Sequence, residues 1–186
     1  MYLGYQNDKI KFYTEQPLNQ ALYNLDKVEE TQEEYVLDGD EYVLKDAEYV
    51  SKKLQEAKEI KYAEANLKAF QYLESGKAVY EYAEGKSIEA TDGNIAKLGL
   101  ALVNFILQQD YTSTIEWNTK ENENVQLNAE LLQGIVAGLQ AIQAEVWTIK
   151  FPVYNTQIAE AETVEEVEAI IIDYSVNEEE IKEEVE

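Results

Sequence analysis

Apolar residues recur at steps of three and four over residues 47–75, which is the spacing of one face of an α-helix. No Gly or Pro interrupts this pattern, and Gly76 follows it as a helix-terminating residue. At about 1.5 Å per residue the predicted helix is roughly 40 Å long, more than a small domain needs. The stripe comprises Val50, Leu54, Ala57, Ile60, Ala63, Leu67, Phe70 and Leu73.

Three further helices are predicted by periodicity and capping residues. Thr91 is placed to cap a helix over 92–109, and Asn128 to cap a longer helix that Pro152 either ends or kinks. Thr163 and Glu166 have the spacing of a capping box before a short helix. The apolar side of the first comprises Ile95, Leu98, Leu102, Phe105 and Ile106. That of the second comprises Leu131 or Leu132, Ile135, Leu139, Ile142, Val146 and Ile149, with Gly134 and Gly138 able to admit a close neighbour.

Alternating apolar and polar residues predict short antiparallel strands between these helices. A strand is expected over 9–13, and Pro17 could open a short helix after it. Hairpins are expected over 33–46, turning at Asp38-Gly39, over 77–91, turning near Gly85, and over 115–127. In the last hairpin we expect Trp117 to be a buried core anchor. Trp117, Trp147 and Thr163 are the predicted structural anchors.

These elements predict an α+β protein with four segments. An N-terminal β-rich attachment segment covers 1–46, and the long amphipathic helix covers 47–75. A helical body with short β-hairpins covers 76–174, and an acidic tail covers 175–186. We expect that tail to be weakly packed, because its stretch "NEEEIKEEVE" offers only Ile181 and Val185 as apolar anchors and clusters like charges.

Composition excludes several kinds of partner and chemistry. The 186 residues carry a net charge of -23, of which -11 lies in 160–186, so binding to nucleic acid or an anionic membrane is not expected. Cys, His and Arg are absent, which removes the common nucleophiles, bases and phosphate clamps. The acids Asp38, Asp40 and Glu41 lack the spacing of a calcium loop and favour a solvated turn. We therefore expect no enzymatic activity and no cofactor or metal.

Three stretches within residues 85–170 and just before them carry a family resemblance. They are "YEYAEGKSIEAT", "IEWNTKENENVQLNAELLQGI" and "AEAETVEEVEAI", and a hydrophobic helix separates the first two. This part of the chain resembles a domain family of unknown function found in the tail modules of tailed phages and prophages. The resemblance implies a tail-fibre-associated structural component or assembly accessory, located in the virion tail or in the host cytoplasm during assembly.

Protein–protein contact is the expected mode of action, with other tail or fibre proteins as partners. Leu54, Ile60, Leu67 and Phe70 of the long helix are the candidate partner-binding residues. Their stripe could also support a homo-oligomer, a trimer by analogy with tail fibres, or it could fold back onto the body of a monomer. The alternative function is an acidic inhibitor or DNA mimic acting on the host. A carbohydrate-binding or carbohydrate-cleaving module is a third possibility.

Overall fold

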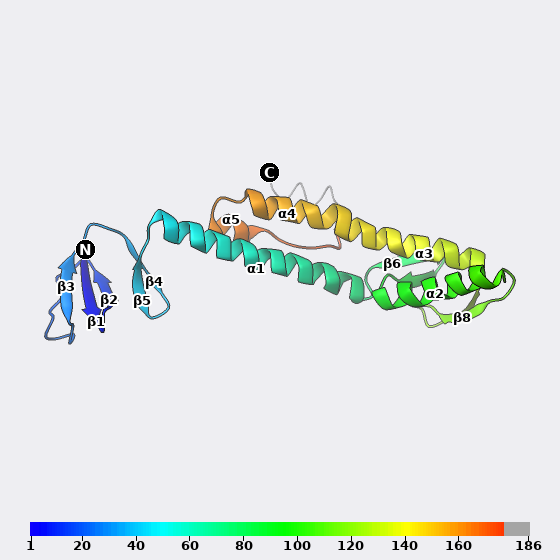
Figure 1. The fold of residues 1–186 in the computed structure, drawn as a ribbon, viewed down its shortest axis with the longest axis horizontal. Helices are drawn as coiled ribbons and strands as arrows, with labels where there is room; N and C mark the ends of the chain where they lie inside the picture. The colour runs from blue at the N-terminus through cyan, green and yellow to red at the C-terminus, as the bar shows by residue number, and fades with distance from the viewer. Residues whose placement is uncertain (177–186) are drawn as a thin grey trace. The chain divides into compact units, whose positions relative to one another are not determined.

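The computed structural model describes residues 1–176, in which helices alternate with antiparallel hairpins (Figure 1). This confirms the α+β class. The chain divides into two units, Met1–Ala57 and Lys58–Glu186, so that the boundary falls inside the long helix α1 (Ala47–Glu74). The predictions for the acidic tail concern mainly residues 177–186, which lie outside the described residues.

The first unit contains a three-stranded antiparallel sheet in the order β2-β1-β3 and a separate hairpin, β4–β5. Tyr13 of the sheet contacts Tyr35 and Tyr42 of the hairpin, with ring centroids 5.5 and 5.9 Å apart. These tilted aromatic contacts join the two parts of the unit. The strands are β1 (Tyr2–Gln6), β2 (Lys9–Thr14), β3 (Lys27–Glu30), β4 (Tyr35–Asp38) and β5 (Glu41–Leu44).

Two local predictions in this unit were wrong. No helix follows Pro17: residues 20–24 form only a turn, which begins with a hydrogen bond from the amide of Leu22 to the side chain of Asn19 and ends at Asn24, whose φ is 53°. The hairpin β4–β5 turns one residue later than predicted. Asp38 pairs with Glu41, which leaves Gly39 at the first central position with φ of 64°, where a type II′ turn requires a positive φ.

The second unit places α1 antiparallel to a long helical run that begins at Ala129 (Figure 1). Two hairpins, β6–β7 and β8–β9, lie with α2 near the start of that run. The turns and caps agree with prediction: Gly85 has φ of 67°, and Thr91, Asn128 and Thr163 each accept the expected N-terminal amide. The elements are β6 (Val79–Ala83), β7 (Lys86–Glu89), α2 (Asp92–Gln108), β8 (Ile115–Asn118), β9 (Asn124–Leu127), α3 (Ala129–Ala144), η1 (Glu145–Lys150), α4 (Phe151–Glu160) and α5 (Val164–Ala169).

Pro152 does not end the helical run. A π-helical segment, η1, precedes the proline, and α4 continues for ten residues to Glu160. Pro152 stands in the first turn of α4, where a missing backbone N–H is tolerated because the hydrogen-bond pattern has changed from that of α3. The change in helical period therefore accommodates the proline within one continuous run.

The core of the second unit extends from α1, the helical run and the extended segment 170–174 to α2 and the two hairpins. Its largest fully buried side chains include Leu98, Leu132, Leu139 and Ile158. Tyr154 and Tyr174 meet there in an edge-to-face contact with centroids 5.2 Å apart. The hydroxyl of Tyr174 donates to the carbonyl of Ala65 in α1 at 3.1 Å, so the segment is fixed to the middle of that helix.

Candidate functional site

The apolar stripe of α1 largely faces solvent. The core face of the helix is formed by Ala65, Ala69 and Leu73, whereas the side chains of Ile60 and Leu67 are 71% and 55% exposed. Phe70 is 49% exposed. These three residues therefore do not pack on the body, although α1 itself does so through the face that contains Ala65, Ala69 and Leu73. Among the four candidate partner-binding residues, only Leu54 is half-buried, and it lies in the first unit.

Part of this exposed face forms one wall of a groove with a volume of about 670 Å³. Leu67 and Phe70 contribute apolar side chains from α1, and Phe151 contributes an aromatic ring from α4. None of the described residues that line the groove is charged. Its lining residues are Tyr62, Ala63, Asn66, Leu67, Phe70, Phe151 and Asn155.

Asn155 lines the groove, and its side-chain oxygen lies beneath the surface. That oxygen, Oδ1, is buried and accepts no hydrogen bond within the described part of the chain. Because the atom is closed to solvent, it is also closed to a docked group as long as Asn155 keeps this conformation. The groove thus offers mainly apolar and aromatic contact, which is typical of binding sites.

Three lysines of α1 and Lys150 of η1 donate hydrogen bonds to backbone carbonyls of the C-terminal part of the unit, and none of the four lines the groove. Lys61 and Lys68 donate to alternate carbonyls of the extended segment, and both also pair with Glu64 of α1. The hydrogen bonds that Lys68 and Lys61 donate to the carboxylate of Glu64 lower the pKa of that carboxylate. The position of α4 beside α1 is fixed in this way. The four lysine bonds run from Lys58 to Ala159 (2.8 Å), Lys61 to Ile170 (3.2 Å), Lys68 to Ile172 (3.3 Å) and Lys150 to Tyr174 (3.1 Å).

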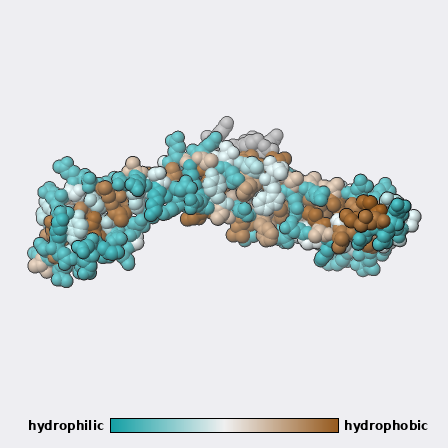
Figure 2. All heavy atoms as spheres, viewed as in Figure 1, coloured by the Kyte–Doolittle hydropathy of each residue, from teal (hydrophilic) through white to brown (hydrophobic). Residues whose placement is uncertain are grey.

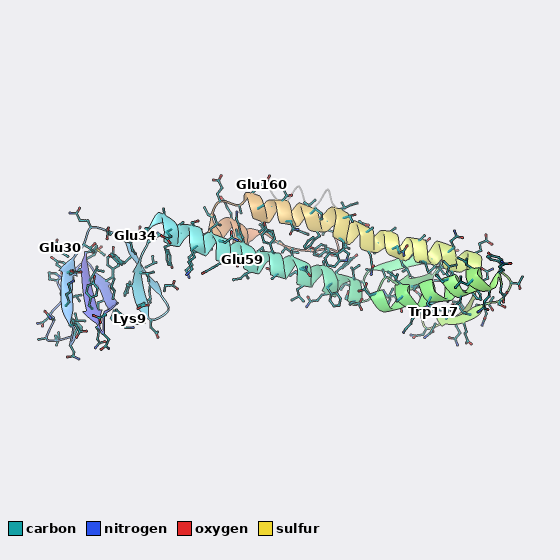
Figure 3. All side chains as sticks on the ribbon, in the orientation of Figure 1. Lys9, Glu30, Glu34, Glu59, Trp117 and Glu160 are labelled. Carbon is teal, nitrogen blue, oxygen red and sulfur yellow. The ribbon has the colours of Figure 1, made fainter. Side chains whose placement is uncertain are left out.

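The three predicted structural anchors occupy different surroundings. Trp117 on β8 (labelled in Figure 3) is half-buried and packs against the core, so it is less enclosed than expected. Trp147 is also half-buried and meets Phe151 edge-on at 5.4 Å between centroids. Thr163 caps α5 through a complete capping box with Glu166. None of the three lines the groove.

A second exposed apolar surface, on α2, was missed by the sequence analysis. Periodicity identified the buried side of this helix, including Leu98 and Phe105, but Leu100 and Leu107 on the other side are 63% and 76% exposed. Ile106, which was assigned to the buried side, is also exposed. The sequence does contain a signal for this exposed apolar surface, since residues 98–109 include no charged side chain.

The described residues offer no arrangement for metal chemistry. In this part of the chain, no three carboxylates gather closely enough to hold a metal ion. Among residues 1–176, no helix has the length and apolar character that a membrane span requires. What the groove can do chemically is bind: it has aromatic and aliphatic walls, and none of its described lining residues is charged.

Comparisons of this chain with protein-family profiles, with curated proteins and with solved structures found no match. The resemblance to a phage tail-module family therefore remains a prediction.

Proposed function

We propose that this protein is a tail-associated structural component or assembly accessory of a phage or prophage, and that it acts by binding other tail or fibre proteins. The observation that carries the binding role is the groove between α1 and α4, beside the exposed residues Ile60, Leu67 and Phe70. The phage context comes from the sequence resemblance. Binding to a nucleic acid or membrane is not part of the proposal, because the net charge is -23.

The groove favours a protein partner that inserts apolar side chains. Its apolar and aromatic walls suit an aliphatic or aromatic anchor, the usual centre of an interface. A second copy of the chain, in a homo-oligomer formed through α1 such as a trimer, is the alternative occupant of this face.

The test is mass spectrometry of purified particles from the phage or induced prophage that encodes the chain, combined with binding of the purified full chain to isolated tail and fibre proteins. We expect the chain in particles or in a complex with one of these proteins. Leu67→Glu with Phe70→Glu should weaken binding at least tenfold, while Ile171→Glu should not, since that exposed residue is outside the groove. Absence from particles and from all such complexes would reject the proposal.

A second candidate is an acidic inhibitor or DNA mimic, favoured by the net charge of -23. Such a protein would bind a nucleic-acid-binding protein of the host, be displaced by duplex DNA and be absent from particles. Groove variants would not affect that binding, whereas added salt would weaken it strongly. Binding of a purified glycan at the aromatic groove would instead support the carbohydrate-binding alternative.

A further inference from the structure

Helix α2 is apolar on both its buried and its exposed side. Leu98 and Phe105 belong to the core of the second unit, while Leu100, Val103 and Leu107 are 63%, 49% and 76% exposed. Figure 2 shows hydrophobic residues gathered over α2. A helix that is apolar all round is typical of one that is buried on every side. The exposed side of α2 therefore has the character of an interface rather than of an ordinary surface.

Spacing makes this side suitable for packing against another helix. Residues 100, 103 and 107 follow steps of three and four, the pattern of a helix–helix seam, and Ala96 continues it one turn earlier. The seam is flanked by Ile106, which is also exposed. Within residues 96–110 the only charged residues are Lys97, next to the first residue of the seam, and Asp110, after its last residue.

We propose that two copies of this protein form a symmetric dimer in which their α2 helices pack antiparallel about a two-fold axis near Val103 and Asn104. In this arrangement Leu100 of one copy lies against Leu107 of the second copy, and the same contact occurs again on the other side of the axis. The surface is thus complementary to itself, as an isologous interface requires.

Charge selects the antiparallel orientation. An antiparallel pair brings Lys97 of each copy to the level of Asp110 of the other along the helix axes, whereas a parallel pair places Lys97 opposite Lys97. Within the described part of the chain Lys97 forms no ion pair, so its ammonium is available. The pKa of Asp110 is lowered by hydrogen bonds from Ser113 and Thr112, which keeps its carboxylate charged.

The high net charge of the whole chain does not forbid this contact. Helix α2 contains one acid, Asp92, and one base, Lys97, and is neutral overall. Repulsion between the acids elsewhere is screened over about 8 Å at physiological salt. Asn104, the polar residue nearest the proposed axis, can pair its amide with that of Asn104 in the second copy and so fix the register.

Sedimentation velocity of the full chain over a micromolar concentration range tests the dimer. We expect a species of twice 21.3 kDa that dissociates on dilution. Leu100→Glu with Leu107→Glu should give a monomer or raise the dissociation constant at least tenfold, and Lys97→Glu should raise it to a smaller extent. The matched control, Ile60→Glu with Phe70→Glu on α1, should leave the dimer intact. Thermal denaturation establishes that each variant is folded.

Disulfide cross-linking tests the orientation, because the natural chain has no Cys. A mixture of Leu100→Cys and Leu107→Cys chains should cross-link rapidly under mild oxidation, while Leu100→Cys alone should not. In the antiparallel pair the two residues at 100 are offset by about 10 Å along the axes, too far for a disulfide.

A monomer at every concentration would overturn the proposal, as would a trimer. So would a dimer that the α2 variants leave intact, or faster cross-linking of Leu100→Cys alone than of the mixture. The outcome is independent of the phage assignment, which depends on particle content and on the α1 groove.

Discussion

Two glycines four residues apart in α3 have different roles at the scale of single residues. A side chain at Gly138 would collide with the ring of Tyr80 from β6, whereas one at Gly134 would meet nothing within 4 Å. The close approach predicted for this pair therefore occurs at Gly138 alone. A substitution at Gly134 is therefore a matched control for the same substitution at Gly138.

Gly138→Ala should lower the free energy of unfolding by about 1–3 kcal/mol, because Tyr80 must shift from a packed position. Gly134→Ala should instead raise it by up to about 1 kcal/mol, since Ala is the better helix former. Urea denaturation of both variants measures the difference. Equal effects of the two substitutions would mean that Tyr80 does not pack on α3 in solution.

A single carboxylate joins the turn after β8 to strand β7. Glu121 accepts hydrogen bonds from both the hydroxyl and the backbone amide of Ser87, and these lower its pKa to about 2. A carboxylate with a lowered folded-state pKa stabilises the fold above its unfolded-state pKa and loses that contribution as pH falls toward the folded value. The Ser87 contact should therefore persist through mild acid.

Glu121→Gln should be less stable than the parent at pH 7, and the difference should shrink between about pH 4.5 and pH 2 as Glu121 takes up a proton. Melting temperatures at pH 7 and near pH 2 test this without measuring close to the isoelectric point of 4.2, where the chain is least soluble. Glu116→Gln, an exposed change on β8, is the control. A constant difference at both pH values would contradict the assignment.

At the scale of elements, periodicity predicted α1 well but did not identify its core face. The buried face uses Ala65 and Ala69, whose small side chains admit Tyr174, while larger apolar residues remain outside. Lys61 also lies mostly buried, with its stem covered and its ammonium bonded to Ile170. A pattern that counts only large apolar residues misses such a face.

Hairpins and caps were predictable because their determinants are local. Gly85, Thr91 and Asn128 act within three or four residues of themselves. The groove was predictable only in part: Leu67 and Phe70 were candidates, but Phe151 and Asn155 come from a helix far along the chain. Which residues of α4 meet α1 depends on how the unit packs, and no short-range pattern encodes it.

The lysine bonds to the extended segment give a prediction at the same scale. Lys61→Met keeps the apolar stem but removes the donor to Ile170, and should lower the free energy of unfolding by about 1–2 kcal/mol. Residues 170–174 should also exchange their amide hydrogens faster. Lys52→Met, at a highly exposed position, should change stability by less than about 0.5 kcal/mol. Unchanged exchange in the segment would show that the bond to Lys61 does not hold it.

Repulsion between like charges should determine how the stability of the whole molecule changes with salt concentration. With 38 acids and 15 lysines, repulsion opposes the folded state more than exposed ion pairs support it. Raising the salt concentration from about 0.01 M to 0.1 M shortens the screening length from about 30 Å to 10 Å, so the melting temperature should rise. Sodium and choline chlorides should act alike. A fall in melting temperature with both salts would mean that ion pairs dominate.

The bond between Tyr174 and Ala65 has a consequence for folding during synthesis. It joins residues 109 positions apart, and the lysine bonds to Ile170 and Ile172 span similar distances along the chain. Such non-local contacts form late, and a ribosome delivers the N-terminal part first. We therefore expect the core face of α1 to remain uncovered until residue 174 has been made, which makes the nascent second unit dependent on the segment 170–174.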